Sequence, residues 1–244
     1  RYRAKSSDEV RAAVRKIGYP IIVKPIAGAG SADTYTARSD EELERALAAS
    51  AHVEEVSVEE YIDGEEYTFD TICVDGTILY YNIAWYRPRP LIGRTVEWIS
   101  PQTVTLRDVE QPALAAGREM GKAVLRALDF RTGFTHMEWY LKGDGEAVFG
   151  EIAARPPGAR SVELMNYSCD IDVFAGWAEA ACKGRFSQVY FSRERRGDAV
   201  ATLPKLLKAS PASAASLGER LMLEAEFRDA DRQSVAAAFG PEFA

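Results

Sequence analysis

The sequence predicts an α+β fold with mostly antiparallel sheets. Two turn signals, Asp75-Gly76 and Gly143-Asp-Gly145, each separate two apolar runs and so predict β-hairpins. The predicted strands also outnumber the crossover helices that a doubly wound parallel sheet requires. Because hairpins join antiparallel strands, we expect mixed layers of helices and antiparallel sheet.

The first part of the chain alternates short strands with capped helices. Ser6 and Ser39 each precede acidic residues, which is the pattern of a helix N-terminus. The elements expected, in chain order, are a helix ending at Gly18, strands at 19–25 and 34–37, a helix from 39 to about 50, and a strand at 56–62.

The central part of the chain predicts the two hairpins and two long helices. The elements expected are strands at 67–74 and 77–85, a Pro-rich loop at 86–93, a helix at 110–128, the second hairpin, and a helix from 161 to about 183. Apolar residues at helical spacing mark the helix at 110–128. Residues 212–232 are expected to form one helix or two.

Composition narrows the classes of function. The formal net charge of −7 argues against general nucleic-acid binding. No apolar run approaches the roughly 18 residues that span a membrane, and no signal peptide is visible. The three cysteines lack metal-ligand spacing, so we expect reduced thiols in a cytoplasmic protein. The two histidines exclude a histidine-rich metal site.

Two acidic residues of the second hairpin are the most informative about function. Glu138 lies in Thr135-His-Met-Glu-Trp-Tyr, and Glu151 lies in Phe149-Gly-Glu-Ile-Ala-Ala-Arg155. Side chains on one face of a hairpin converge, and two close carboxylates repel unless a cation or a proton lies between them. Arg155 adds a positive fork suited to phosphate or carboxylate. The cluster indicates a magnesium–phosphate site, with a glycosidase acid/base pair as an alternative.

Lys24 and the glycine loop that follows it form a second candidate. Lys24 lies in the apolar run Ile21-Ile-Val-Lys-Pro25, and Gly28, Gly30 and Ser31 allow backbone N–H groups to approach an anion closely. A lysine in such a strand is equally expected to reach solvent from an edge. The loop matches neither the P-loop nor the Rossmann pattern.

The segment Glu59-Glu-Tyr-Ile-Asp-Gly-Glu-Glu66 is a third candidate. One interpretation is a solvated acidic strand end. The other is a hinge whose backbone pairs with an adenine edge, followed by an acid that accepts hydrogen bonds from ribose. His136 lies on the same strand face as Glu138 if the strand is regular, and the sequence favours no single role for it. No Gly-x-Ser-x-Gly motif supports a serine hydrolase.

In this order and spacing, the three segments resemble the ATP-grasp superfamily over residues 1 to about 185. The resemblance implies two α+β lobes that clamp a nucleotide, here residues 1–63 and 64–185, followed by an extension at 186–244. It implies that Lys24, with Gly28, Gly30 and Ser31, binds phosphates. It implies that Glu59, Glu60, Tyr61 and Ile62 line the adenine site, largely through backbone, and that Glu66 holds the ribose. Glu138 and Glu151 would hold Mg²⁺, and Arg155 would stabilise the transferred phosphoryl group.

The chemistry implied by the resemblance is ATP-dependent, Mg²⁺-dependent activation of a carboxylate as an acyl-phosphate, which an amine then attacks. We expect a carboxylate–amine ligase of the amino-acid or peptide-forming type. The alternatives are a carboxylase or carbamoyl-phosphate enzyme, or a nucleotide-binding module that has lost catalysis. The expected partners are small-molecule carboxylate and amine substrates, and a homodimer is allowed; neither nucleic acid nor a membrane is expected.

Two departures from the family pattern stand out. Ala153 occupies the position where the family usually has a metal-binding asparagine, so a second metal would lose one ligand. The family's N-terminal domain is also absent before Arg1, and we expect the chain to be a fragment whose isolated site is incomplete. Arg87, Arg89 and Arg94 are candidates for binding the substrate carboxylate, although a surface loop made soluble by arginines is as plausible.

Overall fold

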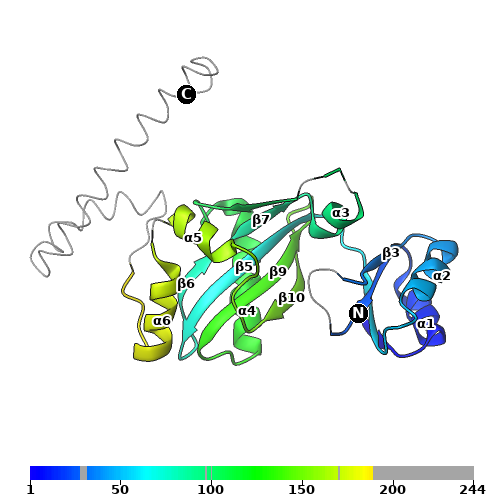
Figure 1. Ribbon diagram of the computed structural model, residues 1–244, viewed down its shortest axis with the longest axis horizontal. Helices are drawn as coiled ribbons and strands as arrows, with labels where there is room; N and C mark the ends of the chain where they lie inside the picture. Colours follow the sequence, from blue (N-terminus) through cyan, green and yellow to red (C-terminus); the bar gives the residue numbers. More distant parts are fainter. Residues whose placement is uncertain (28–31, 97, 100, 170, 189–244) are drawn as a thin grey trace, which may run out of the picture. The chain divides into compact units, whose positions relative to one another are not determined.

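The computed structural model describes residues 1–27, 32–96, 98–99, 101–169 and 171–188 of the chain. Its described strands form two sheets, and the strand pairs among the described residues are antiparallel (Figure 1). The predicted α+β class with mostly antiparallel sheets is therefore confirmed. Within these described ranges no helix has both the length and the apolar character needed to cross a membrane.

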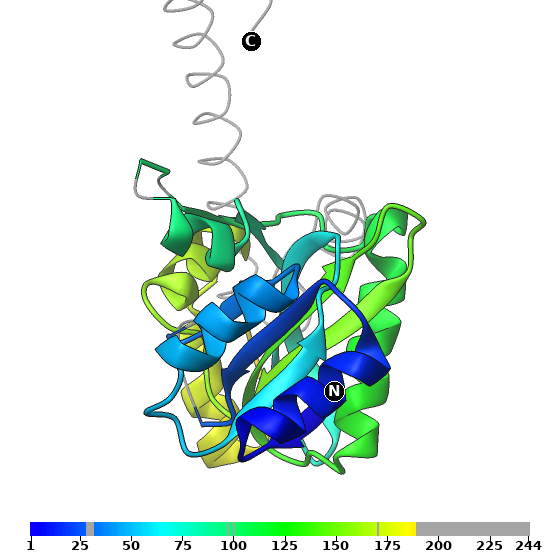
Figure 2. The same cartoon turned by 90° about the vertical axis from the view of Figure 1, so that its right-hand side faces the viewer.

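The small sheet belongs to the first sixty residues. Its strands, in order across the sheet, are β1 (Tyr2–Ala4), β4 (Val56–Glu60), β2 (Ile21–Pro25) and β3 (Tyr35–Ala37). Two helices, α1 (Ser7–Ile17) and α2 (Asp40–Ala49), lie against one face of it (Figure 2). The hydroxyls of Ser6 and Ser39 accept hydrogen bonds from backbone N–H groups of the first turn, as the sequence predicted.

Alternation along β2 separates a core face from a free face. Ile21 and Val23 are fully buried beneath the two helices, whereas Lys24 is directed to the opposite face. The same alternation in β4 buries Val58 and turns Glu59 to the face that carries Lys24. The apolar period of two thus brings these two charged side chains together.

The large sheet carries most of the described chain. Its strands, in order, are β10 (Ala147–Ala153), β9 (Gly133–Leu141), β5 (Glu65–Val74), β7 (Ala84–Arg87) and β8 (Gln102–Thr105), and β6 (Thr77–Asn82) also pairs with β5. The remaining helices are α3 (Pro90–Thr95), a 3₁₀ turn (Pro112–Leu114), α4 (Ala115–Ala127), α5 (Ser161–Cys169) and α6 (Val173–Lys183).

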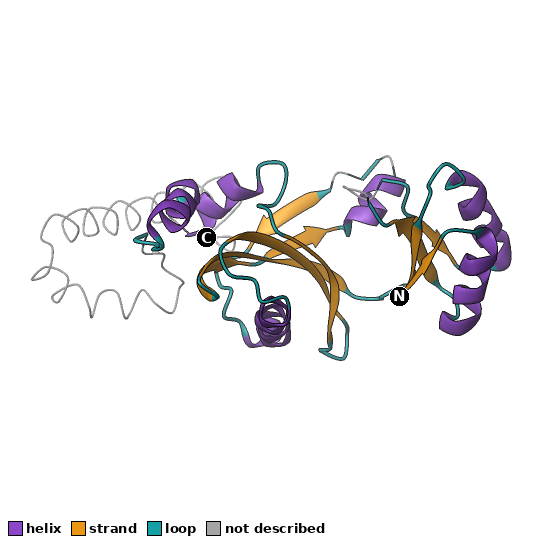
Figure 3. Ribbon diagram, turned by 90° about the horizontal axis from the view of Figure 1, so that it is seen from below, coloured by secondary structure: helices purple, strands orange, loops and turns teal. Residues whose placement is uncertain are grey.

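Helices cover the two faces of the large sheet differently (Figure 3). α4 packs on the face of Phe69, Met137 and Trp139. On the other face, α5 and α6 cover the end that carries Ile72 and Phe134. The rest of that face is polar, because Glu66, Thr68 and Asp70 of β5 point there with alternate residues of β9.

Some sequence predictions of elements were wrong. The single helix expected from 161 to 183 is two helices, since the side chain of Asp172 caps a new helix start at Val173. The segment 86–93 is part strand and part helix, because Pro90 occupies the first helical turn, where a proline is tolerated. β1 and β8 were not predicted from the sequence.

Candidate functional site

A cavity of ≈ 290 Å³ is lined by side chains from both sheets. The lining residues are Arg1, Lys24, Glu59, Glu60, Ile62, Arg89, Glu138, Tyr140, Val148, Phe149, Gly150 and Glu151. A second cavity, of ≈ 540 Å³, is lined by residues of β3, α2 and α3 and contains Tyr61 from the predicted set. The smaller cavity holds most of the charged residues that the sequence predicted, namely Lys24, Glu59, Glu60, Glu138 and Glu151, so we assign the candidate site to it.

The two predicted metal-binding carboxylates are direct neighbours across β9 and β10. Glu138 and Glu151 are Cα partners, and a β-bulge at Gly150 creates that register. Without the bulge, Glu151 would pair with Met137, whose side chain is buried in the core on the other face. A Cβ atom at position 150 would lie 2.7 Å from the carbonyl oxygen of Glu138, so the bulge requires glycine. The glycine in Phe149-Gly-Glu151 thus permits the bulge that places Glu151 opposite Glu138.

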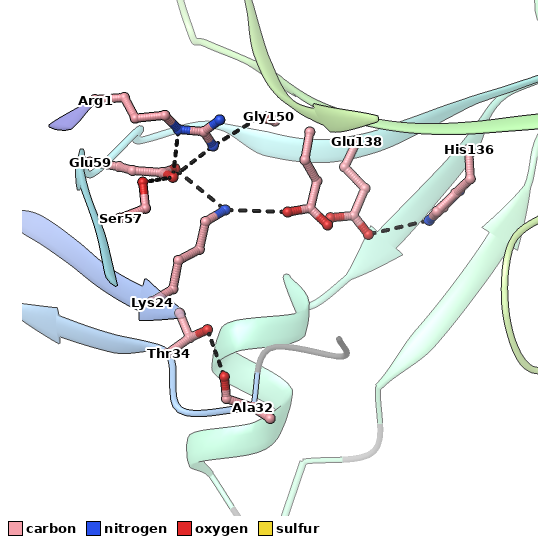
Figure 4. A network of polar contacts seen from close by, with 10 residues as sticks. Arg1, Lys24, Ala32, Thr34, Ser57, Glu59, His136, Glu138 and Gly150 are labelled. Carbon is pink, nitrogen blue, oxygen red and sulfur yellow. Dashed lines mark hydrogen bonds and ion pairs between the residues drawn. The ribbon is translucent and has the colours of Figure 1, made fainter. Parts of the chain in front are cut away.

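Lys24 brings a positive charge to this pair from the small sheet. Its Nζ lies 3.3 Å from Oε2 of Glu151 and 3.4 Å from Oε2 of Glu59 (Figure 4). The lysine side chain is 24% exposed, so the ion pairs are only partly screened by solvent. The structure therefore brings Lys24, Glu151 and Glu138 together in one cavity, although Lys24 is more than one hundred residues from either glutamate in sequence.

Glu59 contributes its side chain to the cavity as well as its backbone. Its Oε1 accepts hydrogen bonds from Nε of Arg1 at 2.7 Å and from the hydroxyl of Ser57 at 2.7 Å. Arg1 also donates to the carbonyl of Gly150 at 3.4 Å. The carboxylate of Glu59 is thus the centre of a basic cluster, a position that the sequence did not indicate.

The predicted hinge at Glu60, Tyr61 and Ile62 connects the two sheets. The N–H of Tyr61 donates to the carbonyl of Pro20 at 3.1 Å, and the carbonyl of Ile62 accepts from Arg89 at 2.6 Å. The guanidinium of Arg89 also lies over the rings of Tyr61 and Tyr140. Two of the backbone groups proposed for base recognition therefore already have partners within the chain.

Glu66 is a buried carboxylate at the edge of the site. Arg89 is its partner, with Nε 3.3 Å from Oε2, and both side chains are almost inaccessible to solvent. Burial, together with the negative charge of Glu138, raises the pKa of Glu66 to about 7, and Arg89 offsets only part of this rise. Burial and nearby carboxylates also raise the pKa of Tyr86.

His136 lies beside Glu138 in a chain of buried polar groups. Its Nδ1 is 2.5 Å from Oδ1 of Asp70. Its Nε2 is 3.5 Å from Oε1 of Glu138 (Figure 4). Burial acts to lower the pKa of His136, but hydrogen bonds and charge interactions with Asp70 and Glu138 outweigh burial and raise it to about 9. The histidine thus bears a positive charge between two carboxylates at neutral pH.

The other predicted residues lie outside this cluster or outside the described chain. Arg155 is exposed, and its guanidinium donates to the carbonyl of Pro156 at 2.8 Å. It is close enough to Tyr86 to act on that hydroxyl's pKa. Arg87 stacks on Trp85 with a separation of 4.3 Å. Gly28, Gly30, Ser31 and most of the extension at 186–244 lie outside the described residues, as does the side chain of Arg94.

A comparison with protein-family models matches residues 17–162 to the ATP-grasp domain. This segment contains the β2 lysine, the hinge and both carboxylate strands. The chain belongs to the ATP-grasp family. The resemblance inferred from the three sequence motifs is therefore confirmed.

Individual ATP-grasp proteins are similar to this chain over part of their length. The L-arginine-specific L-amino acid ligase of Bacillus subtilis is 32% identical over 174 residues, covering 68% of this chain and 41% of the ligase. The formate-dependent phosphoribosylglycinamide formyltransferase of Erythrobacter litoralis is 33% identical over 166 residues, covering 64% of this chain and 40% of that protein. The chain thus spans about two fifths of the curated relatives that it matches.

A solved structure supports the same fold. The N5-carboxyaminoimidazole synthetase of Staphylococcus aureus, crystallised with ADP, superposes with a TM-score of 0.57 at 17% identity. The match covers 73% of this chain and 45% of that one. At this identity the match is evidence for the ATP-grasp fold and not for a shared substrate.

Several residues around the candidate site were not predicted from the sequence. Asp70, Tyr86, Tyr140 and Arg1 all contact or surround the predicted set. One signal was available for Asp70, because polar residues alternate at 66, 68 and 70 within an otherwise apolar run. Arg1 and Tyr86 gave no such signal, since their proximity depends on strand pairings between distant segments.

Proposed function

We propose that this chain forms the nucleotide-binding and carboxylate-activating part of an ATP-dependent carboxylate–amine ligase. The supporting observation is that Lys24 meets Glu138 and Glu151 in a single cavity. A positive charge beside paired carboxylates suits a nucleotide polyphosphate that is bound together with a cation. The names of the two curated relatives, an amino acid ligase and a formate-dependent enzyme, are consistent with a small carboxylate as substrate.

The donors present fit one Mg²⁺ ion. Within the described ranges, no group of three or more His, Cys, Asp or Glu residues is arranged to hold a metal ion. Mg²⁺ needs no larger protein set, since one or two carboxylates usually suffice when phosphate oxygens and water complete its coordination. We assign Glu138 and Glu151 as its protein ligands, with Ala153 supplying none. When bound, the ion neutralises charge that develops on the phosphoryl oxygens.

The remaining residues would bind and orient the nucleotide. Lys24 would exchange its present carboxylate partners for phosphate, with Gly28, Gly30 and Ser31 closing over it. Glu59 to Ile62 would line the adenine site, and the carbonyl of Ile62 has a second lone pair although Arg89 occupies one. Glu66, held by Arg89 beneath the hinge, would accept hydrogen bonds from the ribose.

Phosphoryl transfer in such a site depends on positioning and charge more than on proton transfer. Arg155 extends into solvent from the end of β10, two residues beyond the bulged strand, and has no carboxylate partner among the described residues. We assign it to the transferred phosphoryl group and the acyl-phosphate that results. An amine then attacks that acyl carbon and phosphate leaves, which is the step that defines the ligase.

Alternative functions have less support. Neither of the two curated relatives is named as a carboxylase or a carbamoyl-phosphate enzyme. A module without catalysis is motivated by Ala153, which supplies no metal ligand. Nucleotide binding is common to all of these functions, so binding is the first property to test.

Calorimetry of ATP binding, with and without Mg²⁺, tests the site. We expect Glu151→Ala to weaken the Mg²⁺-dependent part of the affinity at least tenfold and the Mg²⁺-independent part by less than threefold, because only the former uses this carboxylate. Glu146→Ala is the matched control, since Glu146 is an exposed carboxylate of the same hairpin outside the cavity. Equal losses in both conditions, or no binding by the wild type, would contradict the proposal.

An assay of phosphate release tests the ligase reaction. We expect phosphate release from ATP to require a carboxylate and to be stimulated by an amine across a panel of small substrates. Lys24→Ala should abolish most of this release, because it removes the cation nearest the carboxylate pair. Phosphate release that no amine stimulates would exclude the amine-ligase assignment and leave the binding assignment intact.

A further inference from the structure

Glu138 and Glu151 are held by different partners. Glu151 is 60% exposed and pairs with Lys24 from the small sheet. Glu138 is 25% exposed and faces His136 on its own strand. The position opposite His136 on β10 is Ala153, whose methyl group offers no hydrogen bond. In the row that contains His136 and Ala153, His136 is therefore the polar neighbour of Glu138.

A chain of hydrogen bonds anchors His136 to the centre of the large sheet. The backbone N–H of Ala84 donates to Oγ1 of Thr68 at 3.1 Å, and that hydroxyl donates to Oδ2 of Asp70 at 2.6 Å. The other oxygen of Asp70 lies 2.5 Å from Nδ1 of His136. Both carboxylate oxygens of Asp70 are thus engaged, and the imidazole ring is fixed with Nε2 toward Glu138.

Strand register accounts for this arrangement. Asp70 is the Cα partner of His136, and Thr68 is the Cα partner of Glu138, so the four side chains form two adjacent rows on one face. Thr68 and Asp70 are each 1% exposed. A buried ionic group of this kind gives little net stability compared with apolar residues of similar volume. Its position beside the carboxylate pair is better explained by a role in the site.

The inference that follows rests on the proposed function. We propose that Asp70 and His136 are positioning residues, which hold the Glu138 carboxylate toward the cavity for a metal–nucleotide ligand. Partners of this kind orient a ligating carboxylate, and their loss typically lowers metal affinity about 10- to 100-fold. Neither residue touches the nucleotide in this proposal, because Asp70 is buried and His136 is 8% exposed behind Glu138.

The test compares ADP binding with Mn²⁺ and without metal, and measures bound Mn²⁺ directly by electron paramagnetic resonance. His136→Leu should weaken Mn²⁺ binding in the presence of ADP about 10- to 100-fold. It should change metal-free ADP affinity less than threefold. His136→Gln keeps a donor near the Nε2 position and should recover part of the loss, and Asp70→Asn should have an intermediate effect.

His52→Leu is the matched control, since His52 also pairs with an aspartate, Asp33, but on the exposed surface of the small lobe. It should leave both affinities unchanged. Equal losses of metal-free and metal-dependent binding in His136→Leu would show a purely structural role and overturn the inference. So would failure of His136→Gln to bind Mn²⁺ better than His136→Leu. A wild type that binds ADP identically with and without Mn²⁺ would instead refute the proposed metal site, and the inference with it.

Discussion

At the scale of single residues, burial changes the pKa of one carboxylate at the edge of the site, Glu66. Glu66 lies at 5% exposure with Arg89 as its neutralising partner, while Glu138 and Glu151 add negative charge nearby. Its pKa near 7 means that the group is partly protonated under ordinary conditions. Protonation turns one oxygen of the carboxylate from an acceptor into a donor. The surroundings of Glu66 therefore determine how many hydrogen bonds it can accept.

Glu66 makes stability depend on pH in a defined direction. Because its pKa is about 7 in the folded protein and about 4.5 when unfolded, the folded state binds more protons between these values. The free energy of unfolding should then fall as pH rises from 4.5 to 7, by about 3 kcal/mol at most from this group. Urea unfolding at several pH values should show a smaller fall for Glu66→Gln. A parallel pH dependence in both proteins would contradict the assigned pKa.

At the scale of elements, the β9–β10 hairpin shows what sequence can and cannot predict. The turn at 143–145 correctly predicted the hairpin, and the prediction that Glu138 and Glu151 share a face agrees with the register. A regular hairpin in this register would have put them on opposite faces, so the agreement depends on a bulge that alternation alone does not reveal.

Contacts between residues that only long-range strand pairing brings together could not be predicted from the sequence. Asp70 and His136 are 66 positions apart, and only the pairing of β5 with β9 makes them neighbours. The sequence suggested where His136 points but gave it no partner. Arg89 was proposed for a substrate carboxylate, whereas in the structure it pairs with Glu66 inside the protein.

Gly150→Ala tests the bulge. The added Cβ would lie 2.7 Å from the carbonyl of Glu138, so the hairpin must shift, at a cost of about 1–3 kcal/mol in the free energy of unfolding. The shift should also reduce Mg²⁺-dependent ADP binding, measured by calorimetry. Gly143→Ala is the control on the same hairpin, since no atom lies within 4 Å of its added Cβ. Wild-type behaviour of Gly150→Ala in both measurements would refute the role of the bulge.

Gly117→Ala tests the contact of α4 with the sheet. A Cβ at this position would lie 2.3 Å from the ring of Trp139, which is fully buried. Alanine favours a helix by about 1 kcal/mol over glycine, but overpacking should prevail and lower the free energy of unfolding by about 1–3 kcal/mol. Adding Trp139→Phe, which shortens the ring, should recover part of the loss in a double-mutant cycle. Stabilisation by the single change would contradict this packing.

On the scale of the whole described molecule, each sheet has a core of its own. Val10, Ile21 and Val58 belong to the cluster of the small sheet, and two further clusters lie on the faces of the large sheet. The cavity side chains are presented by both sheets but belong to none of these clusters. Local opening of one sheet is therefore expected to leave the core of the other intact.

Hydrogen exchange followed by mass spectrometry tests this independence. Ile21→Ala removes a fully buried side chain of the small sheet and should lower the protection of β2 and β4 amides by about 2–4 kcal/mol. Protection of β5 and β9 should change little. The reciprocal variant, Ile72→Ala, should show the opposite pattern. Uniform loss of protection in either variant would show a single cooperative unit.

The lining of the cavity has a further consequence for what it admits. It includes the basic residues Arg1, Lys24 and Arg89 and the acidic residues Glu59, Glu60, Glu138 and Glu151. A bare polyphosphate would meet an excess of like charge in this lining, whereas a bound divalent cation would cancel two of its negative charges. We therefore expect this lining to favour a nucleotide that carries a divalent cation over the same nucleotide without one.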